Sequence, residues 1–466
     1  MVSNAKPLKK ELDMTHKKQT KRRLAFLGKV FGGIILLTIV IHTLAVMLTG
    51  NSVRKAKEAM IASGYPMSTS EIIPPPIEDS INAAMELKKV FGLLTLGSDE
   101  MYSPGKLAGK VAKEYEDILK HYDSKRDTPY SHKHLTQLAE AFSGEDSNRI
   151  FQLITDVAAK KEAQFKRDYS AGPKLLLPEL GLHRKVCQML AVRAMYEAQK
   201  SNKAEALRLL RECLIIGDLF RREPILISQL CRLANFSISL GALQLISTSF
   251  ELDGSELDDL YKLLTPYTDP SLFIKGIHGE RLLYGQWFFD ERKPVEEAWW
   301  GEPVVIFLYR WYRWYPIRPL CNADHTSYLN LMRVQTQLLE KDSNLAVTGD
   351  MDRIAQQEIG TFSFLTKMIS PPLSKVSLNL VKSKSLLEMT QIGIACNQFK
   401  HRKGSYPKSL DDLNKTPMES VTGKPYQFLR TKKAIYIYSD IEIYDGSLVI
   451  DINHKTEKVH GVKINL

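Results

Sequence analysis

Three neighbouring side chains, His278, Glu280 and Arg281, are of types that could exchange protons with a substrate. No metal-ligand spacing or phosphate-binding loop accompanies them, and the chain has no G-x-S-x-G, H-E-x-x-H, Walker or Rossmann pattern. We therefore interpret Glu280 and Arg281 as an ion pair that fixes helix packing, and Asp324-His325 as a helix cap with a nearby side chain. No catalytic or cofactor-binding residue is predicted, although a site built from scattered residues remains an alternative.

A second group of residues suits contacts with a partner or a membrane. All five Trp lie between positions 287 and 314, together with several Tyr and Arg residues. This segment has three interpretations: a buried aromatic core, an interfacial segment that dips into lipid headgroups, or a docking patch for a partner or glycan. Its apolar run is too short to cross a bilayer. The interface candidates are Trp299, Trp300, Tyr309, Arg310, Trp311, Arg313 and Trp314.

The five cysteines form no metal or disulfide pattern. They lie far apart, without a C-x-x-C pair, at Cys187, Cys213, Cys231, Cys321 and Cys396. An odd number leaves at least one unpaired in an oxidising compartment. We interpret them as small buried hydrophobic residues.

Composition and charge narrow the class of protein. The chain has 466 residues, 44% hydrophobic and 25% charged, with a mean hydropathy of −0.21. These values exclude collagen-like, low-complexity and wholly disordered chains, and also a many-pass transporter. The formal net charge is 64 − 53 = +11, and residues 1–23 contribute +6 of it, which leaves +5 for the remaining 443 residues. Because this charge stops at an apolar run, we interpret it as a topology signal and expect no nucleic-acid partner.

The apolar run from Val30 to Leu48 has 19 residues and no formal charge. As a helix it would span about 28 Å, close to the thickness of a bilayer core. It predicts a transmembrane anchor over 24–49 behind a basic cytoplasmic tail over 1–23, with a cleaved signal peptide as the alternative. We expect a single-pass protein of the inner (cytoplasmic) membrane whose C-terminal bulk is extracytoplasmic. Gly28 and Gly32 could pair two anchors into a homodimer, but a single anchor without pairing is the preferred interpretation.

The pattern beyond the anchor predicts a mainly α fold. Residues 50–80, with three consecutive prolines, are typical of a stiff Pro-containing stalk. Residues 81–372 predict a helical domain of antiparallel hairpins, the clearest of which joins 186–198 to 204–220. No second copy at about 34 residues supports a repeat array. Further helices are predicted over 225–246, 255–264, 325–341 and 352–369.

At Pro371-Pro372 the character of the chain changes. Residues 373–466 predict a small α+β module, in which a helix over 374–400 precedes an antiparallel sheet. Alternating apolar runs over 425–430 and 434–444 predict strands, Asp445-Gly446 a hairpin turn, and 447–452 the strand that continues the sheet.

The residues of this module resemble the globular head of a type II secretion major pseudopilin. The matching segments are Gly404–Pro407, Ser409–Leu413 and Thr422–Phe428. The chain has neither the leader Gly nor the following Glu of a pilin, so it resembles the head alone. The resemblance implies a calcium site near the last strands, with a solvated hairpin face as the preferred alternative. The nearest carboxylates are Asp440, Glu442 and Asp445.

The exported part as a whole is similar to a group of uncharacterised single-pass proteins of planctomycete and verrucomicrobial bacteria. The matching segments are 75–76 with 82–84, 168–173, 176–178, 222–230, 279–281 and 318–320. The resemblance implies architecture and localisation but no activity. We expect a membrane-anchored extracytoplasmic scaffold or interaction module that contacts the lipid bilayer and an envelope protein. An accessory component of a secretion or pilus-like machine, and an envelope hydrolase, are the alternatives.

Overall fold

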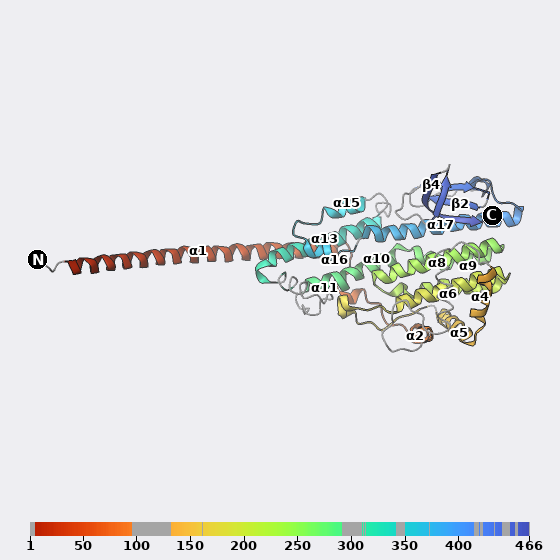
Figure 1. Cartoon of the computed structure of the whole chain (residues 1–466), viewed down its shortest axis with the longest axis horizontal. Coiled ribbons are helices and arrows are strands. Elements are labelled where there is room, and N and C mark those ends of the chain that lie inside the picture. The colour runs from red at the N-terminus through yellow and green to blue at the C-terminus, as the bar shows by residue number, and fades with distance from the viewer. Residues whose placement is uncertain are drawn as a thin grey trace.

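The computed structural model of the chain describes most of its residues. These are 5–95, 132–160, 162–290, 310, 312, 314–341, 350–371, 373–413, 419, 423–432, 434–439, 448–452 and 455–465. They form an elongated helical body from which one long helix projects at one end, with a small sheet near the other end (Figure 1). The predicted mainly α fold with a small C-terminal α+β module is confirmed.

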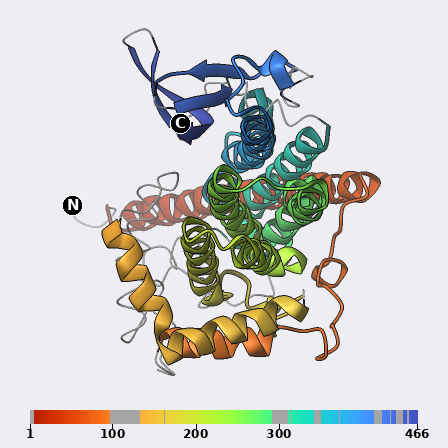
Figure 2. The same ribbon diagram turned by 90° about the vertical axis from the view of Figure 1, so that its right-hand side faces the viewer.

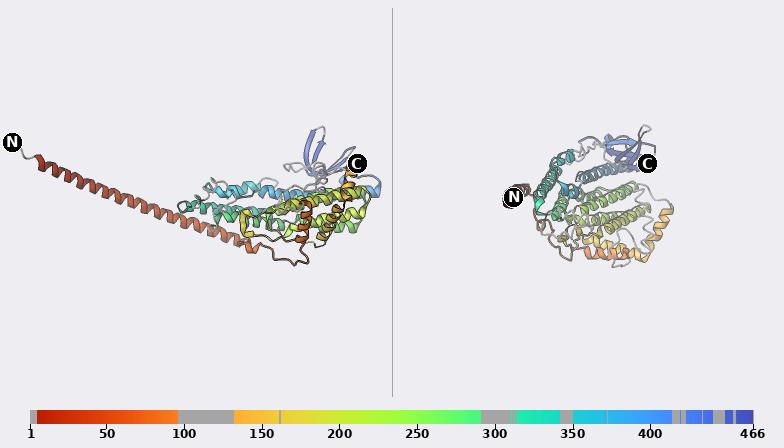
Figure 3. Two further views of the ribbon diagram at one scale, coloured as in Figure 1. Left: turned by 60° about the horizontal axis from the view of Figure 1, so that its bottom comes forward. Right: turned by 60° about the vertical axis from the view of Figure 1, so that its left-hand side comes forward.

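The first helix, α1 (Ala5–Ala62), contains the whole predicted anchor. Every residue from 23 to 41 is exposed, because this part of the helix projects beyond the body (Figures 1 and 3). Two described helices are long and apolar enough to cross a membrane, namely α1 from Arg23 onward and α8 (Leu226–Ser249). The most apolar stretch of α8 is 67% buried in the body, whereas that of α1 is 0% buried. Of the two, α1 therefore has the apolar surface available to a membrane.

The predicted stalk over 50–80 differs from the structure in its first part. Helix α1 continues without a break to Ala62, and its outer part packs against α13 (Arg318–Lys341). Beyond Ala62 the chain forms a largely irregular strap over 63–83, and Tyr65 in it is buried. The segment with three prolines thus lies on the body and does not hold it away from α1, because its apolar side chains find partners there.

The body consists of helices that run mostly along its long axis (Figure 1). Before α8 come α2 (Ala84–Thr95), α4 (His132–Ser143), α5 (Glu145–Lys160), α6 (Glu179–Gln199) and α7 (Lys203–Gly217). After it come α9 (Gly254–Leu264), α10 (Pro270–Gly279), α11 (Gln286–Phe289), α13, α15 (Asp350–Gln356), α16 (Phe364–Ile369) and α17 (Leu373–Lys403). A π-helical turn, η5 (Glu280–Gly285), joins α10 to α11, and a 3-10 segment, η2 (Tyr169–Lys174), precedes α6.

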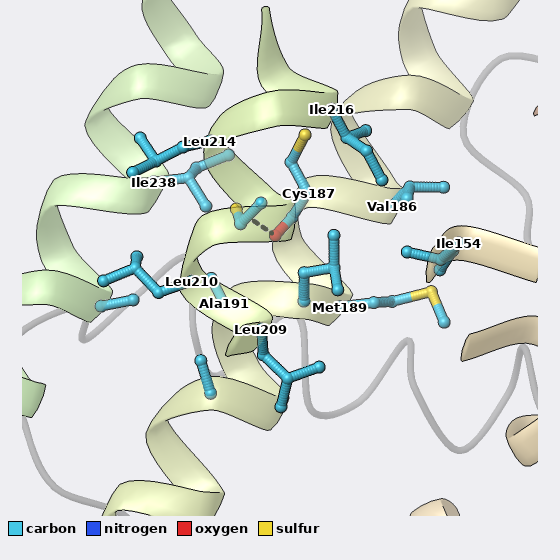
Figure 4. Close-up of a cluster of buried hydrophobic side chains, with 14 of the residues drawn as sticks. Ile154, Val186, Cys187, Met189, Ala191, Leu209, Leu210, Leu214, Ile216 and Ile238 are labelled. Atoms are coloured by element: carbon cyan, nitrogen blue, oxygen red, sulfur yellow. Dashed lines mark hydrogen bonds between the residues drawn. The ribbon is translucent and has the colours of Figure 1, made fainter. Parts of the chain in front are cut away.

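The hairpin predicted from residues 186–220 is confirmed as α6 and α7. Their facing sides bury a continuous apolar cluster, to which α5 and α8 add residues such as Ile154 and Ile238 (Figure 4). Within it the Cys213 thiol donates to the Cys187 carbonyl oxygen at 3.3 Å. All five cysteines are free, and all except the partly buried Cys231 are buried, as the sequence predicts.

The layers of the body follow from which helices share a core. Viewed along the body, the sheet covers α17, α17 packs on α8, and α8 packs on the α6–α7 hairpin (Figure 2). Helices α2 and α5 cover the far side of that hairpin. Helix α8 is apolar on most sides because it lies in the middle of this stack.

Two predictions for the later elements need correction. The helix predicted over 352–369 is two helices, α15 and α16, which are separated by a non-helical segment over 357–363 that contains Gly360. The sheet has four antiparallel strands in the order β1-β2-β4-β3. Strand β4 separates β2 from β3, so the direct hairpin expected between these two strands is wrong, and its proposed turn, Asp445-Gly446, lies outside the described residues. The strands are β1 (Gln427–Arg430), β2 (Ala434–Ser439), β3 (Leu448–Ile452) and β4 (Lys455–Asn465).

Candidate binding cleft and exposed aromatic surface

A cleft opens beside the outer part of α1. Its volume is about 1520 Å³, and five stretches of chain line it: α1, the strap, residues 164–170, residues 282–290, and residues 318–325 at the start of α13. Because these stretches are far apart in the sequence, the cleft exists only in the folded chain. The α1 residues that reach it are spaced by four, three and four positions and form one stripe along the helix. They are Val46, Gly50, Val53 and Lys57.

One wall of the cleft depends on an ion-pair network around Arg167. The side chain of Arg167 is 4% exposed and donates to Glu179 at 2.9 Å and to Glu223 at 3.1 Å. The Tyr169 hydroxyl donates to the same oxygen of Glu223 at 3.2 Å. Burial by itself lowers the pKa of Arg167, but Glu223 and Glu179 outweigh it and raise that pKa overall. The guanidinium therefore stays charged and ties the 164–170 segment to α6 and to the turn before α8.

Trp287 forms another part of the lining, and it packs directly on backbone. Its indole lies against Gly172, where a Cβ atom would be 2.3 Å from the indole Cδ1. The φ of Gly172 is +58°, a conformation that side-chain-bearing residues rarely adopt. Space and backbone conformation thus both require glycine at this position, and the indole takes the place that a side chain would fill.

Several buried nitrogen atoms of the lining have no hydrogen-bond partner in the described part of the chain. They are Arg167 Nη2, Gln286 Nε2, Trp287 Nε1 and His325 Nε2. The His325 ring stacks on Phe289, with centroids 4.5 Å apart. Burial, and then the charges of Lys57 and Arg318, lower the pKa of His325 to about 3. The imidazole is therefore neutral at ordinary pH and can donate one hydrogen bond without adding charge.

The sequence interpretation of Glu280 and Arg281 as an ion pair is wrong. The Arg281 guanidinium, which is fully buried, donates instead to the Pro66 carbonyl oxygen of the strap. Burial lowers the pKa of Arg281 to about 10. Adjacent residues of a helix project in different directions, so Glu280 and Arg281 cannot share one contact easily. His278 lies beside Tyr65 of the strap, with ring centroids 4.9 Å apart, and burial lowers its pKa to about 4.

Glu280 itself gives a testable pH effect. Burial raises its pKa to about 7, and its charge is felt by Tyr284 and Tyr328. The pKa of Glu280 is higher in the folded state than in the unfolded state, where it is near 4.5. Its contribution to the free energy of unfolding is therefore fully present below pH 4.5 and is lost as the pH rises to 7. Glu280→Gln keeps the neutral shape, so we expect equal stability near pH 4.5 and a gain of about 3 kcal/mol at pH 8. Urea unfolding of the full-length chain in detergent, followed by Trp fluorescence, measures this difference.

Buried histidines also make the stability depend on pH, in the opposite direction; burial lowers the pKa of His183, for example, to about 4. Because wild type and Glu280→Gln share these histidines, their effect cancels when the two proteins are compared at the same pH. Glu251→Gln, at an exposed position, controls for the loss of one carboxylate. A constant difference between wild type and Glu280→Gln from pH 4.5 to pH 8 would contradict the assignment.

The prediction that Asp324 caps a helix beginning at His325 is wrong, because α13 begins at Arg318; Asp324 caps α16 instead. It lies inside α13, is 0% exposed, and accepts the backbone N–H groups of Leu365 at 2.7 Å and Thr366 at 3.0 Å. These are the second and third residues of α16, which a cap normally serves. The Ser363 side chain, at the N-cap position itself, makes no such bond. The Tyr312 hydroxyl also donates to Asp324, at 2.6 Å.

The structure describes two of the seven predicted interface residues. Trp299, Trp300, Tyr309, Trp311 and Arg313 lie outside the described residues. Arg310 is exposed, and Trp314 is 59% exposed. The described residues of the aromatic segment differ in exposure. Trp287 and Tyr312 lie in a buried cluster separate from the one between α6 and α7, whereas Trp314 faces solvent.

Exposed aromatic side chains gather near the point where α1 leaves the body. Tyr315 is 62% exposed and lies beside His42 of α1, with ring centroids 5.1 Å apart. The His42 Nε2 is also 3.0 Å from the Pro316 carbonyl oxygen. Helix α16, which Asp324 holds against α13, lies at the same end of the body (Figure 1). We name two exposed residues of this end the aromatic collar: Trp314 and Tyr315.

The three calcium candidates, Asp440, Glu442 and Asp445, lie outside the described residues. Within the described ranges, no group of three or more His, Cys, Asp or Glu side chains could hold a metal ion. The calcium site therefore stays a prediction.

The cleft, and the ion-pair network that supports its wall, were not predicted from the sequence. Arg167, Glu179 and Glu223 are separated by 12 and 44 positions, and no local pattern joins residues so far apart. The one available signal was a charged residue directly before Pro224, at the start of a predicted helix. Searches of protein-family models, of curated proteins and of solved structures found no match to this chain.

Proposed function

We propose that the protein is a single-pass membrane protein with a cytoplasmic N-terminus, whose body is an extracytoplasmic scaffold held directly on the membrane surface. The exposed apolar part of α1 and the basic residues that precede it support this topology. No catalytic activity belongs to the proposal. Arg167, in the cleft wall, serves a structural role through its ion pairs with Glu179 and Glu223.

The observation that carries the proposal is the change of exposure along α1. Residues 23–41 are all exposed, and from His42 onward one side of the helix becomes partly covered by the body. A bilayer core of about 30 Å takes about 20 helical residues. The predicted anchor over 24–49 overlaps the part of α1 that the body begins to cover at His42. The body therefore begins within about the last two turns of the anchor, which favours a body resting on the membrane.

The aromatic collar supports the same position. Trp and Tyr prefer the membrane–water interface, where the ring is apolar and its polar atom stays hydrated. Tyr315 lies at the level of His42, hence about two turns before the outer end of the predicted anchor. The exposed Arg310 lies four positions before Trp314 in the sequence and suits anionic headgroups.

Topology and anchoring can be tested together. Carbonate washing should leave the full-length protein in the membrane fraction, and alkaline phosphatase fused after Leu466 should be active. In-cell crosslinking followed by mass spectrometry should return envelope proteins linked to the body. Release by carbonate, or an inactive phosphatase fusion with an active cytoplasmic reporter at the same site, would overturn the topology. Crosslinks confined to lipid would overturn the scaffold role.

The collar gives a sharper prediction by Trp fluorescence. We expect brominated lipids to quench Trp314 in vesicles that contain the full-length protein, because this exposed indole would lie at the bilayer boundary. Trp314→Phe should therefore lower the quenched fraction of the emission. Trp287→Phe, the matched control, should raise that fraction, because it removes a buried indole. The same sign of change for both variants would contradict the placement.

A further inference from the structure

The cleft beside α1 is lined by residues with unpartnered donor groups and by positively charged side chains. We propose that it binds the phosphate-bearing headgroup of an anionic lipid. This site goes beyond the scaffold role. Its assignment to a lipid rests on the membrane position proposed above, whereas binding itself is measured in detergent.

Hydrogen-bond donors without acceptors identify the ligand as an acceptor. Arg167 Nη2 and Trp287 Nε1 are unpartnered, and their side chains are more than nine-tenths buried. The Gln286 Nε2 atom is buried and unpartnered in the same lining. Leaving a buried donor unsatisfied is costly, so several on one lining point to a group that accepts many hydrogen bonds. A phosphate, with its several unprotonated oxygens, meets this requirement.

The charges of the lining favour an anion. Lys57 and Arg318 lie close enough to His325 to act on its ring, which places two cations and a neutral donor together. Lys166 and Arg167 line the cleft as well. The lining also contains two carboxylates, Asp168 and Asp290. Asp168 accepts from the Ser170 backbone and hydroxyl groups, at 3.0 and 2.6 Å. Glu179 and Glu223 neutralise the charge of Arg167. The attraction of the cleft for an anion therefore comes mainly from the side that carries Lys57.

The position of the cleft favours a lipid as the source of the phosphate. Its α1 stripe begins at Val46, one turn beyond His42, where the helix enters the body. Apolar side chains, including Val53, Leu283 and Phe289, line the same space. A headgroup could enter while its acyl chains stay near the apolar surface of α1. A free phosphate would use the donors but leave this apolar lining without a role.

The test uses the purified full-length protein in nonionic detergent and a fluorescent short-chain phosphatidic acid. We expect saturable binding that Lys57→Gln and Gln286→Leu each weaken by about tenfold, since each removes one donor or charge-assisted contact. Lys55→Gln is the matched control, because it removes the same charge from an exposed position on the same helix outside the lining. It should change the affinity less than about twofold.

The competing outcomes are distinct. Absence of saturable binding, or equal weakening by Lys57→Gln and Lys55→Gln, would overturn the site. Inorganic phosphate that competes as strongly as the lipid would show that the acyl chain contributes nothing and would overturn the lipid assignment. Trp287→Phe removes the indole N–H donor and should also weaken binding. A melting temperature equal to that of wild type would show that this loss of binding is not a loss of fold. Binding that persists in a protein shown to be unanchored would refute the topology while leaving the site intact.

Discussion

Asp324→Ala should destabilise the body by about 4 kcal/mol. The carboxylate is completely buried and accepts the N–H groups of Leu365 and Thr366, which no other group satisfies in its place. Each buried donor left without a partner costs about 1–3 kcal/mol, and two backbone donors cannot turn elsewhere as hydroxyl groups can. Helix α16 would lose its cap, and the Tyr312 hydroxyl would lose its acceptor. The bond from the Thr366 hydroxyl to the carbonyl oxygen of residue 324, at 2.9 Å, would remain as part of the attachment to α13.

Urea unfolding of the full-length protein in detergent measures this loss through Trp fluorescence, because all five Trp lie between 287 and 314, close in the sequence to Asp324. Asp324→Asn keeps one oxygen and should lose about half as much. Asp258→Ala, at an exposed position of α9, is the matched control and should change stability by less than about 0.5 kcal/mol. A loss below about 1 kcal/mol for Asp324→Ala would show that α16 does not depend on this contact.

The sequence predicted Asp324 as a cap but not its helix. Capping residues have a recognisable type, and short polar side chains before a helix usually serve that helix. Here the donor helix begins about 40 positions later, so its identity depends on tertiary packing. The α6–α7 hairpin, by contrast, was predicted well, because apolar spacing and a turn at Ser201 are local features.

The sheet shows the same limit of local patterns. Strands β1, β2 and β3 carry the alternating apolar residues from which they were predicted. Strand β4 was missed because its sequence, KTEKVHGVKIN, contains many charged residues and a glycine. It forms a strand because β2 and β3 pair with it on either side, with Val462 and Ile464 reaching the core. Backbone pairing outweighs the weak propensity of its residues.

The long apolar helix α1 was predicted in position but not in extent. The apolar run located the exposed part of α1 correctly. The prolines then suggested a spacer from residue 50, whereas helix continues to Ala62 because Ala56 and Met60 pack into the body. The cleft could not be foreseen at all, since it depends on α1 entering the body as a helix and lying beside α13.

The second large effect is expected at Gly279, where two segments of backbone meet. A Cβ at this position would lie 1.5 Å from the Pro224 carbonyl oxygen and 2.6 Å from the Pro224 carbonyl carbon. Neither atom belongs to a flexible side chain, so Gly279→Ala must push α10 away from the chain that leads into α8. Overpacking commonly costs 1–3 kcal/mol, and because backbone must move here we expect at least about 3 kcal/mol.

Gly181→Ala is the matched control, because it is also a helical glycine but has nothing within 4 Å of the added Cβ. It should be neutral, or stabilising by up to about 1 kcal/mol, since alanine favours the helix. Unfolding in urea compares the two variants, and accumulation in the membrane fraction reports on Gly279→Ala if that variant is too unstable to purify. Equal midpoints for the two variants would contradict the close contact.

The same substitution connects the fold to the cleft. Glu223, which holds Arg167 at 3.1 Å, immediately precedes Pro224, so a displaced Pro224 should also displace one anchor of the cleft wall. The π-helical turn that follows Gly279 leads directly to Gln286 and Trp287 on the other side of the lining. If a Gly279→Ala protein can be purified, its affinity for the phosphatidic acid probe should therefore fall even in conditions where its fold persists. Gly181→Ala should leave that affinity unchanged, because α6 contributes no residue to the lining.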